Sequence, residues 1–142
     1  MSEQAAQVIP SFWVEAVEPL RNFFIEKLGF GHMMGVVGKD GNLDFAIVTR
    51  DGLNVMMGRP ETRIDGIGPK AATDRAVEIY MYVGDVDAYH KEVTGRGVSA
   101  VERLETQWWG DRTFAVKDPY GYKIWFCQTV GEVKPPAGVN MI

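Results

Sequence analysis

The sequence is poor in the residues that form disulfides and most metal or nucleophile sites. It has 142 residues but only one cysteine, Cys127, and two histidines, His32 and His90. A single cysteine excludes an internal disulfide and favours a reducing, cytoplasmic compartment. The sequence also lacks a serine–histidine–aspartate set, a zinc-type cysteine cluster and a phosphate-binding glycine loop. We therefore expect Cys127 to be a small buried hydrophobe and the two histidines to be surface or half-buried residues.

Long hydrophobic runs and an excess of positive charge are also missing. No apolar run approaches the ~18 residues of a membrane span, and the first residues, MSEQAAQ, lack the basic and apolar regions of a secretion signal. The chain has 15 Lys and Arg against 19 Asp and Glu, a net charge of −4, so we expect neither nucleic acid nor a membrane as a partner. With 46% hydrophobic and 24% charged residues, the composition is that of one ordinary globular domain over residues 1–142.

The chain repeats itself at a fixed offset of 69 residues, since 82 − 13, 114 − 45 and 121 − 52 all equal 69. Similar residues recur at this one offset over both halves, and no gap is required. A duplicated structural module explains this better than chance does. The matching pairs include Trp13 with Tyr82, Phe45 with Phe114, Ala46 with Ala115, Ile47 with Val116, and Gly52 with Gly121.

Each half has the pattern strand, helix, strand, strand, strand. An apolar stripe between Leu20 and Leu28 predicts the first helix, which Gly29 can end in a left-handed conformation. Asp85 is a suitable N-cap for the second helix. Turns that contain Asp and Gly separate the strands. The expected elements are strand 9–14, helix 18–28 and strands 31–37, 42–49 and 53–58, followed by strand 76–83, helix 85–95 and strands 98–106, 111–117 and 122–128.

These elements define two modules, 8–58 and 76–128. A linker rich in Gly, Pro and charge, 59–75, joins them, and a tail, 129–142, follows. In each module a helix covers one face of a small, mostly antiparallel sheet and leaves the other face in need of a partner. The predicted fold class is α+β, with two tandem βαβββ modules whose curved mixed sheets enclose a cleft, the usual place of a small-molecule site.

Three segments carry a more specific signal. They are the first-half residues Val14 to Phe30, the second-half run Tyr82–Asp87, and Trp109–Tyr122, which has Trp-Gly at its start and Asp-Pro-Tyr-Gly near its end. Together they resemble the vicinal oxygen chelate superfamily, which includes glyoxalase I, extradiol dioxygenases and bleomycin-resistance proteins. The resemblance covers about residues 8–128 and is strongest to the bleomycin-resistance branch. The paired βαβββ modules of that superfamily match the duplication found independently above.

The resemblance implies metal ligands at four positions, which fall on Ile9, Met56, Glu78 and Trp125. Of these, only Glu78 offers a hard oxygen donor, because isoleucine has no donor atom, the indole N–H donates, and a thioether is soft. A catalytic metal needs about three protein ligands. We therefore predict neither a metal nor another cofactor.

Strand alternation places a largely aromatic set on the same side as these four positions. Aromatic walls with a few polar groups suit a planar aromatic ligand or a cation. Glu78 could anchor a basic group or bond to a Tyr or Ser neighbour. The alternative is a filled, ligand-free interior, because aromatic residues at strand spacing usually form core. Asn54 and Lys123, or their near neighbours, are expected to point the same way as Met56 and Trp125. The candidate ligand-binding residues are Ser11, Trp13, Met56, Glu78, Tyr80, Tyr82, Trp108, Trp109 and Trp125.

Three functions fit these features, and the aromatic set without metal ligands favours the first. That is a metal-independent small-molecule binding protein of the glyoxalase/bleomycin-resistance type, which sequesters an aromatic or cationic compound and, as the resemblance implies, provides antibiotic resistance and forms a homodimer. The second is an enzyme of the same superfamily, a lyase, isomerase or dioxygenase. It would use an unrecognised divalent metal, or Glu78 with a pKa raised by desolvation together with a neighbouring tyrosine. The third is a non-catalytic interaction module whose exposed Trp108 and Trp109 serve a protein interface.

Overall fold

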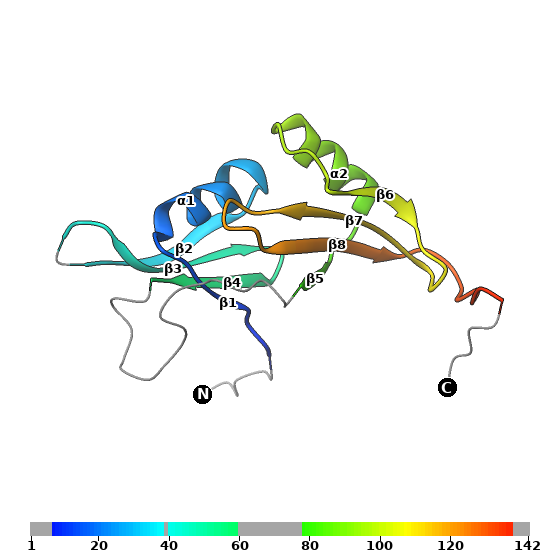
Figure 1. Cartoon of the computed structure of the whole chain (residues 1–142), viewed down its shortest axis with the longest axis horizontal. Coiled ribbons are helices and arrows are strands. Elements are labelled where there is room, and N and C mark those ends of the chain that lie inside the picture. Colours follow the sequence, from blue (N-terminus) through cyan, green and yellow to red (C-terminus); the bar gives the residue numbers. More distant parts are fainter. Residues whose placement is uncertain (1–6, 39, 60–77, 138–142) are drawn as a thin grey trace. The chain divides into compact units, whose positions relative to one another are not determined.

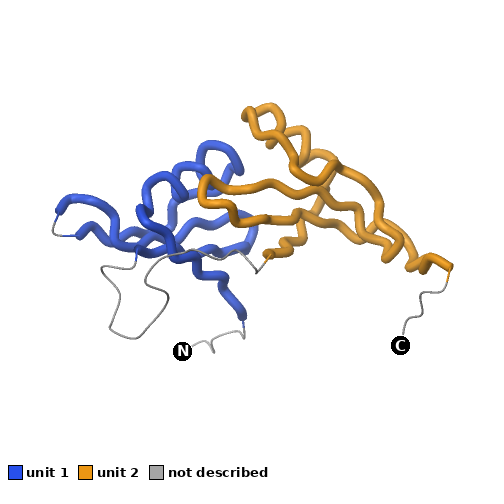
Figure 2. Tube along the Cα trace, viewed as in Figure 1, with its two compact units in different colours: residues 1–73 blue, residues 74–142 orange. Residues whose placement is uncertain are grey.

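The chain folds into two compact units, Met1–Thr73 and Asp74–Ile142 (Figure 2). The computed structural model describes residues 7–38, 40–59 and 78–137. Each unit holds one four-stranded sheet with helical residues on one face (Figure 1). The strand orders are β1-β4-β3-β2 and β5-β8-β7-β6, so the two sheets have the same topology. The predicted α+β class with two βαβββ modules is confirmed, and the cleft between the modules stays a prediction.

Unit 1 builds its sheet from β1 (Ser11–Trp13), β2 (Gly31–Val37), β3 (Leu43–Arg50) and β4 (Leu53–Gly58). Strand β1 pairs with β4 in parallel, with Ser11 opposite Met56, and the other neighbours are antiparallel. Alternate residues of β3 and β4, among them Val48, Val55 and Met57, are fully buried on the helix side of the sheet. Strand β2 lies at the sheet edge and is exposed along its whole length.

The helical segment of unit 1 has an α-helical part followed by a π-helical part, α1 (Val17–Asn22) and η1 (Phe23–Lys27). In the second part the N–H of Leu28 donates to the carbonyl of Phe23, five residues back, at 3.2 Å. Leu20, Phe24 and Leu28 are fully buried, which confirms the apolar stripe. Gly29 then takes a φ of +73°, the left-handed conformation predicted for the end of the helix.

Unit 2 repeats this arrangement with β5 (Ile79–Tyr82), α2 (Val86–Gly95), β6 (Glu102–Thr106), β7 (Asp111–Lys117) and β8 (Lys123–Thr129). Helix α2 begins as predicted, because the carboxylate of Asp85 accepts a hydrogen bond from the N–H of Ala88 (3.0 Å). Tyr89 of α2 packs against Phe114 and Phe126 of the sheet, with ring centroids 6.1 and 4.8 Å away. The core of unit 2 therefore lies between α2 and one sheet face.

The internal repeat is present in the structure, but the gapless offset is wrong for one strand. On β4 and β8 the offset of 69 holds, since Met56 and Trp125 take equivalent places beside β1 and β5. The antiparallel neighbours of these two residues are Ile47 and Ala115, which are only 68 positions apart. The repeat therefore needs a shift of one residue between β3 and β7.

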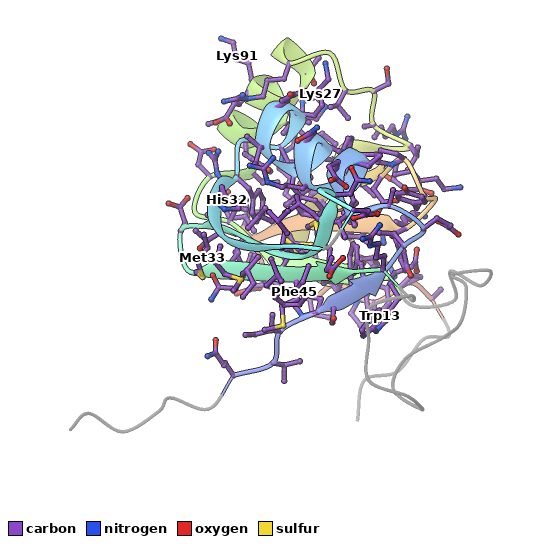
Figure 3. The ribbon with its side chains drawn as sticks, turned by 90° about the vertical axis from the view of Figure 1, so that its left-hand side faces the viewer. Trp13, Lys27, His32, Met33, Phe45 and Lys91 are labelled. Carbon is purple, nitrogen blue, oxygen red and sulfur yellow. The ribbon has the colours of Figure 1, made fainter. Side chains whose placement is uncertain are left out.

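The cause of this shift lies in the hairpins. Two residues, Asp51 and Gly52, join β3 to β4, whereas residues 118–122 join β7 to β8. Because side chains alternate along a strand, a shift of one residue moves a side chain to the other face. Phe45 accordingly lies on the sheet face away from the helix (Figure 3), whereas Phe114 packs under α2.

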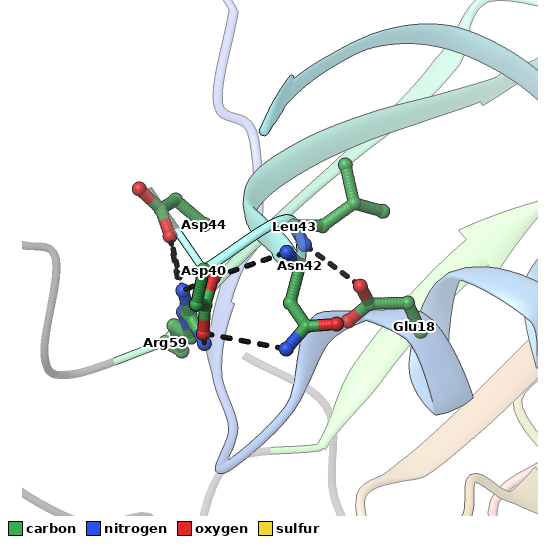
Figure 4. Close-up of polar contacts among 6 residues, drawn as sticks. All are labelled: Glu18, Asp40, Asn42, Leu43, Asp44 and Arg59. Carbon is green, nitrogen blue, oxygen red and sulfur yellow. Dashed lines mark hydrogen bonds and ion pairs between the residues drawn. The ribbon is translucent and has the colours of Figure 1, made fainter. Parts of the chain in front are cut away.

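A network of polar contacts fixes the turn between β2 and β3 to the end of β4 (Figure 4). Arg59 makes ion pairs with Asp40 and Asp44, with N–O distances of 2.9 and 2.6 Å. The hydrogen bonds from Arg59 hold the pKa of Asp40 well below its usual range. The carboxylate of Glu18 on α1 accepts a hydrogen bond from the N–H of Leu43 (2.7 Å). These contacts tie the helix, the turn and β4 together within unit 1.

The remaining differences from the predicted elements are at their ends. The strand predicted over 98–106 begins only at Glu102, and the first strand is confined to Ser11–Trp13. The predicted linker 59–75 lies outside the described residues except for Arg59. Tail residues 130–137 contain neither helix nor strand, as predicted. None of the helices in the described part of the chain is long and apolar enough to cross a membrane.

Gly110, in the turn between β6 and β7, is required both by its backbone conformation and by the space around it. Its φ is +96°, and a Cβ there would lie 2.5 Å from the carbonyl oxygen of Gly131. Gly52 has a similar φ of +83°, but a Cβ there would meet nothing within 4 Å. We expect Gly110→Ala to lower the free energy of unfolding by about 2 kcal/mol more than Gly52→Ala, because only the first adds a backbone clash to the strain. Urea denaturation of both variants measures this difference, and equal losses would contradict it.

Candidate functional site

The sheet face of unit 2 that points away from α2 carries most of the predicted site residues of the second half. Side chains two residues apart on a strand share a face, so the strand register defines rows across it. We call this surface the unit 2 face. Its rows are Glu78–Lys123–Lys117, Tyr80–Trp125–Ala115–Glu102 and Tyr82–Cys127–Thr113–Glu105.

Tyr80 and Trp125 form a stacked pair in the middle row. Their ring centroids are 5.4 Å apart and their planes differ by 15°. The ammonium of Lys123 lies 4.7 Å from the centroid of the Trp125 ring, a cation–π contact. The indole N–H of Trp125 donates to the carboxylate of Glu78 (3.3 Å). Tyr80 is 45% exposed, so the aromatic ring of a ligand can reach the stacked pair.

Two carboxylates share Lys123. Its Nζ lies 3.4 Å from Glu78 and 2.9 Å from Glu102. The hydrogen bond with Glu102 raises the pKa of Lys123, so this side chain stays charged. The side chain of Glu78 is 46% exposed. Its carboxylate is therefore exposed and ion-paired rather than desolvated.

Asp111 is a buried acidic residue that accepts hydrogen bonds from two hydroxyl groups. Tyr82 donates to its Oδ2 at 2.6 Å and Thr129 to its Oδ1 at 2.9 Å. The hydrogen bond to Asp111 raises the pKa of Tyr82 to about 12, and burial raises the pKa of Tyr80. Both phenols are therefore protonated at neutral pH.

Cys127 lies beside Tyr82 in its row and is fully buried, as predicted. Burial raises the pKa of its thiol to about 12, so the thiol is not activated as a nucleophile. The histidines are also where they were expected. The exposed His32 accepts a hydrogen bond from Arg21 (3.1 Å), and the half-buried His90 packs on the ring of Phe114 at 5.0 Å.

The equivalent face of unit 1 is more apolar and carries the predicted residues of the first half. Ser11 lies opposite Met56, and Trp13 lies opposite Gly58. The Trp13 ring covers Gly58, since a Cβ there would lie 3.2 Å from Cζ3 of the indole. Trp13 and Phe45 project from the side of this sheet away from the helix (Figure 3). The structure thus places Ser11, Trp13 and Met56 on one surface of unit 1.

Trp108 and Trp109 occupy the turn between β6 and β7, with their rings edge to face at 5.5 Å. The carbonyl of Trp108 accepts a hydrogen bond from the N–H of Lys134 (2.7 Å), so the tail packs on this turn. The turn leads directly into Asp111 at the start of β7. The two tryptophans therefore lie at the end of the sheet where Asp111 meets Tyr82.

The side chains at the four positions implied by the resemblance do not fit a divalent metal. Ile9, Met56, Glu78 and Trp125 supply a hydrocarbon, a thioether, one carboxylate and an indole whose N–H already donates to that carboxylate. Within residues 7–38, 40–59 and 78–137, no group of three or more His, Cys, Asp or Glu is placed to hold a metal ion.

Comparison with family models identifies the chain. The model of the Glyoxalase/Bleomycin resistance protein/Dioxygenase superfamily matches residues 8–126. The protein belongs to this superfamily. The match spans both βαβββ units, in agreement with the duplication in the sequence and in the sheet topology.

Relatives of this superfamily member occur among known proteins and solved structures. It is 30% identical over 127 residues to the uncharacterized protein Mb0911c of Mycobacterium bovis, a match covering 87% of this chain and 84% of that protein. It is similar to TioX from Micromonospora sp. ML1, with a TM-score of 0.73, 20% identity, and 89% and 100% of the two chains covered. It is also similar to lactoylglutathione lyase from Agrobacterium tumefaciens, with a TM-score of 0.67, 12% identity, and 89% and 96% covered. The two structures establish the shared fold.

Sequence reasoning on this superfamily member missed Asp111 and Glu102 as parts of the unit 2 face. The sequence could have indicated Asp111, because this residue alternates with Thr113 along a strand and belongs to the Trp109–Tyr122 segment that carries the resemblance. No sequence pattern could have indicated Glu102, because the pairing of β6 is irregular between Glu102 and Glu105. Alternation along β6 therefore does not reveal which of its side chains reaches Lys123.

The raised pKa of Tyr82 makes stability depend on pH in the alkaline range. The folded protein holds this proton up to a pKa of about 12, whereas the phenol of the unfolded chain loses it near 10.0. The free energy of unfolding should therefore fall as pH rises from 10 to 12, and Tyr82→Phe should remove part of this fall. At neutral pH, Tyr82→Phe should cost roughly 1–3 kcal/mol, because the buried Asp111 loses a donor.

Urea denaturation of the wild type and Tyr82→Phe across this pH range measures both effects. Tyr120→Phe, in the turn after β7, is the matched control, because it removes a hydroxyl away from Asp111. Parallel pH curves for the wild type and Tyr82→Phe would refute the assignment.

Proposed function

We propose that this superfamily member is a metal-independent small-molecule binding protein of the bleomycin-resistance type. It holds an aromatic compound, preferably a cationic one, on the unit 2 face without making or breaking a bond. The observation that carries the proposal is the solvent-accessible stack of Tyr80 on Trp125, flanked by Glu78 and Lys123.

The stack suits a planar ligand for physical reasons. Offset-stacked aromatic pairs gain about 0.5–1.5 kcal/mol beyond the burial of their area, and the π-face of a tyrosine or tryptophan also attracts a cation. Tyr80 is already held nearly parallel to Trp125, so the binding of a third ring costs little conformational entropy at the site. Ser11, Trp13 and Met56 on unit 1, and Trp108 and Trp109 on the β6–β7 turn, remain predicted contributors to ligand binding.

An enzyme of the superfamily is the alternative, and the local chemistry of the unit 2 face favours it less. The raised pKa values of Tyr80 and Tyr82 prevent either phenol from acting as a base at neutral pH. Glu78 is engaged by Lys123 and by the indole of Trp125. Catalysis would therefore require Glu78 to leave these partners or a metal to bind. A cytoplasmic location, a homodimer and a role in antibiotic resistance remain parts of the proposal.

Binding is tested by isothermal titration calorimetry with basic aromatic antibiotics of the glycopeptide class and with tryptamine. We expect Tyr80→Ala and Trp125→Ala each to weaken binding by about 2- to 12-fold, the loss of one stacking partner. Tyr120→Ala, outside the unit 2 face, serves as the control and should bind as the wild type does. Absence of binding across a broad library of aromatic compounds would contradict the proposal.

Elemental analysis of protein purified without chelator separates the binding protein from the enzyme. A binding protein should contain Fe, Mn, Ni and Zn far below one equivalent per chain. One equivalent of any of these metals would favour the enzyme. Analytical ultracentrifugation of the same sample tests the homodimer.

A further inference from the structure

The direction of each hydrogen bond on the unit 2 face can be assigned from the chemistry of its partners. An ionised carboxylate only accepts hydrogen bonds, so the 2.6 Å contact between Tyr82 and Asp111 uses the single proton of the tyrosine hydroxyl. Thr129 likewise donates its hydroxyl proton to the other oxygen of Asp111 (2.9 Å). Asp111 is only 6% exposed, so it is in place to hold these two donors rather than to meet a ligand.

Two further donors beside the stack, on Trp125 and Lys123, are also directed to carboxylates. The indole N–H of Trp125 is directed to Glu78, and the ammonium of Lys123 lies between Glu78 and Glu102. The charged groups in these contacts are the carboxylates of Glu78, Glu102 and Asp111 and the ammonium of Lys123. A ligand donor that reaches Tyr82 therefore meets a hydroxyl oxygen whose own proton already points to Asp111.

We infer that Asp111 determines the ligand specificity of the unit 2 face: by accepting the hydrogen bond of the Tyr82 hydroxyl, it leaves the tyrosine oxygen as a hydrogen-bond acceptor and selects aromatic ligands that carry an N–H donor or an ammonium group. This inference rests on the proposed function and names the ligand class of that same site. Asp111 acts through Tyr82 and is a positioning residue.

The geometry also sets where the donor of the ligand must be. Tyr82 follows Tyr80 by two residues on β5, which separates their side chains by roughly 7 Å along the strand. A ligand whose ring stacks on Tyr80 and Trp125 needs its donor about that far from the ring centre. Arylethylamines have this spacing. An arylpropionate of similar length carries a carboxylate at the same place and meets lone pairs there.

The test compares tryptamine with indole-3-propionate, which share the ring and differ in the charge and hydrogen-bonding role of the chain. In the wild type we expect tryptamine to bind about tenfold tighter or more. 3-Ethylindole has the same ring and a chain that ends without a donor, so it serves as the neutral reference ligand. We expect tryptamine to bind more tightly than this reference as well. Isothermal titration calorimetry measures all three affinities.

Two variants separate the role of Asp111 from a merely structural one. Tyr82→Phe keeps the ring and all charges but removes the acceptor, so it should reduce the tryptamine preference about threefold or more and leave 3-ethylindole binding unchanged. Asp111→Asn can donate an N–H to the Tyr82 oxygen, which should move the ratio in the same direction. If Asp111→Asn fails to fold, Tyr82→Phe decides the question alone. Tyr120→Phe is the matched control and should keep the wild-type ratio.

The outcomes separate a failure of this inference from a failure of the proposed function on which it rests. If indole-3-propionate binds as tightly as tryptamine, or if Tyr82→Phe keeps the wild-type ratio, aromatic binding stands and the role of Asp111 is refuted. If none of the three probes binds, both are refuted. A preference for tryptamine that falls in Tyr82→Phe, with unchanged 3-ethylindole binding, supports the inference.

Discussion

The parallel pairing of the first and last strands of each unit is the constraint on which the rest of the structure depends. It places residues 45 positions apart opposite each other, Ser11 with Met56 and Tyr80 with Trp125. Closing such a loop costs chain entropy, and burial of the helix-side residues, such as Phe24 in unit 1, offsets that cost. A slip of one residue would exchange the buried and exposed faces, so burial also fixes the register. The stack of Tyr80 on Trp125 exists only in that register.

The two units share a topology and a way of forming a core, but their open faces differ in chemistry. Close packing under the helix accepts only apolar side chains of suitable volume, whereas the other face also carries exposed side chains such as Tyr80 and Tyr82. Unit 1 is largely apolar there, and unit 2 is aromatic and charged. The corresponding residues, 69 positions apart, are Ile9 and Glu78, Ser11 and Tyr80, Trp13 and Tyr82, Asn54 and Lys123, and Met56 and Trp125.

The carboxylates give the unit 2 face its hydrogen-bonding character. A buried carboxylate needs donors to offset its lost hydration, and Asp111 obtains them from Tyr82 and Thr129. Glu78 and Trp125 stand at positions that bind metal in the resemblance, yet here they bond to each other. The face is thus polar and ordered through direct contacts between its own side chains.

The sequence by itself determined the duplication, the order of helices and strands, the helix end at Gly29 and the cap at Asp85. These features follow from backbone preferences and apolar alternation, which act over a few neighbouring residues. The aromatic set on alternate strand positions followed for the same reason. Only the tertiary structure decided that Lys123 is shared by two carboxylates, that Asp111 accepts the hydrogen bond of the Tyr82 hydroxyl, and that the repeat is shifted by one residue between β3 and β7. Such partnerships depend on hairpin length and on which side chains meet across strands distant in the chain, and these are set only when the sheet has formed.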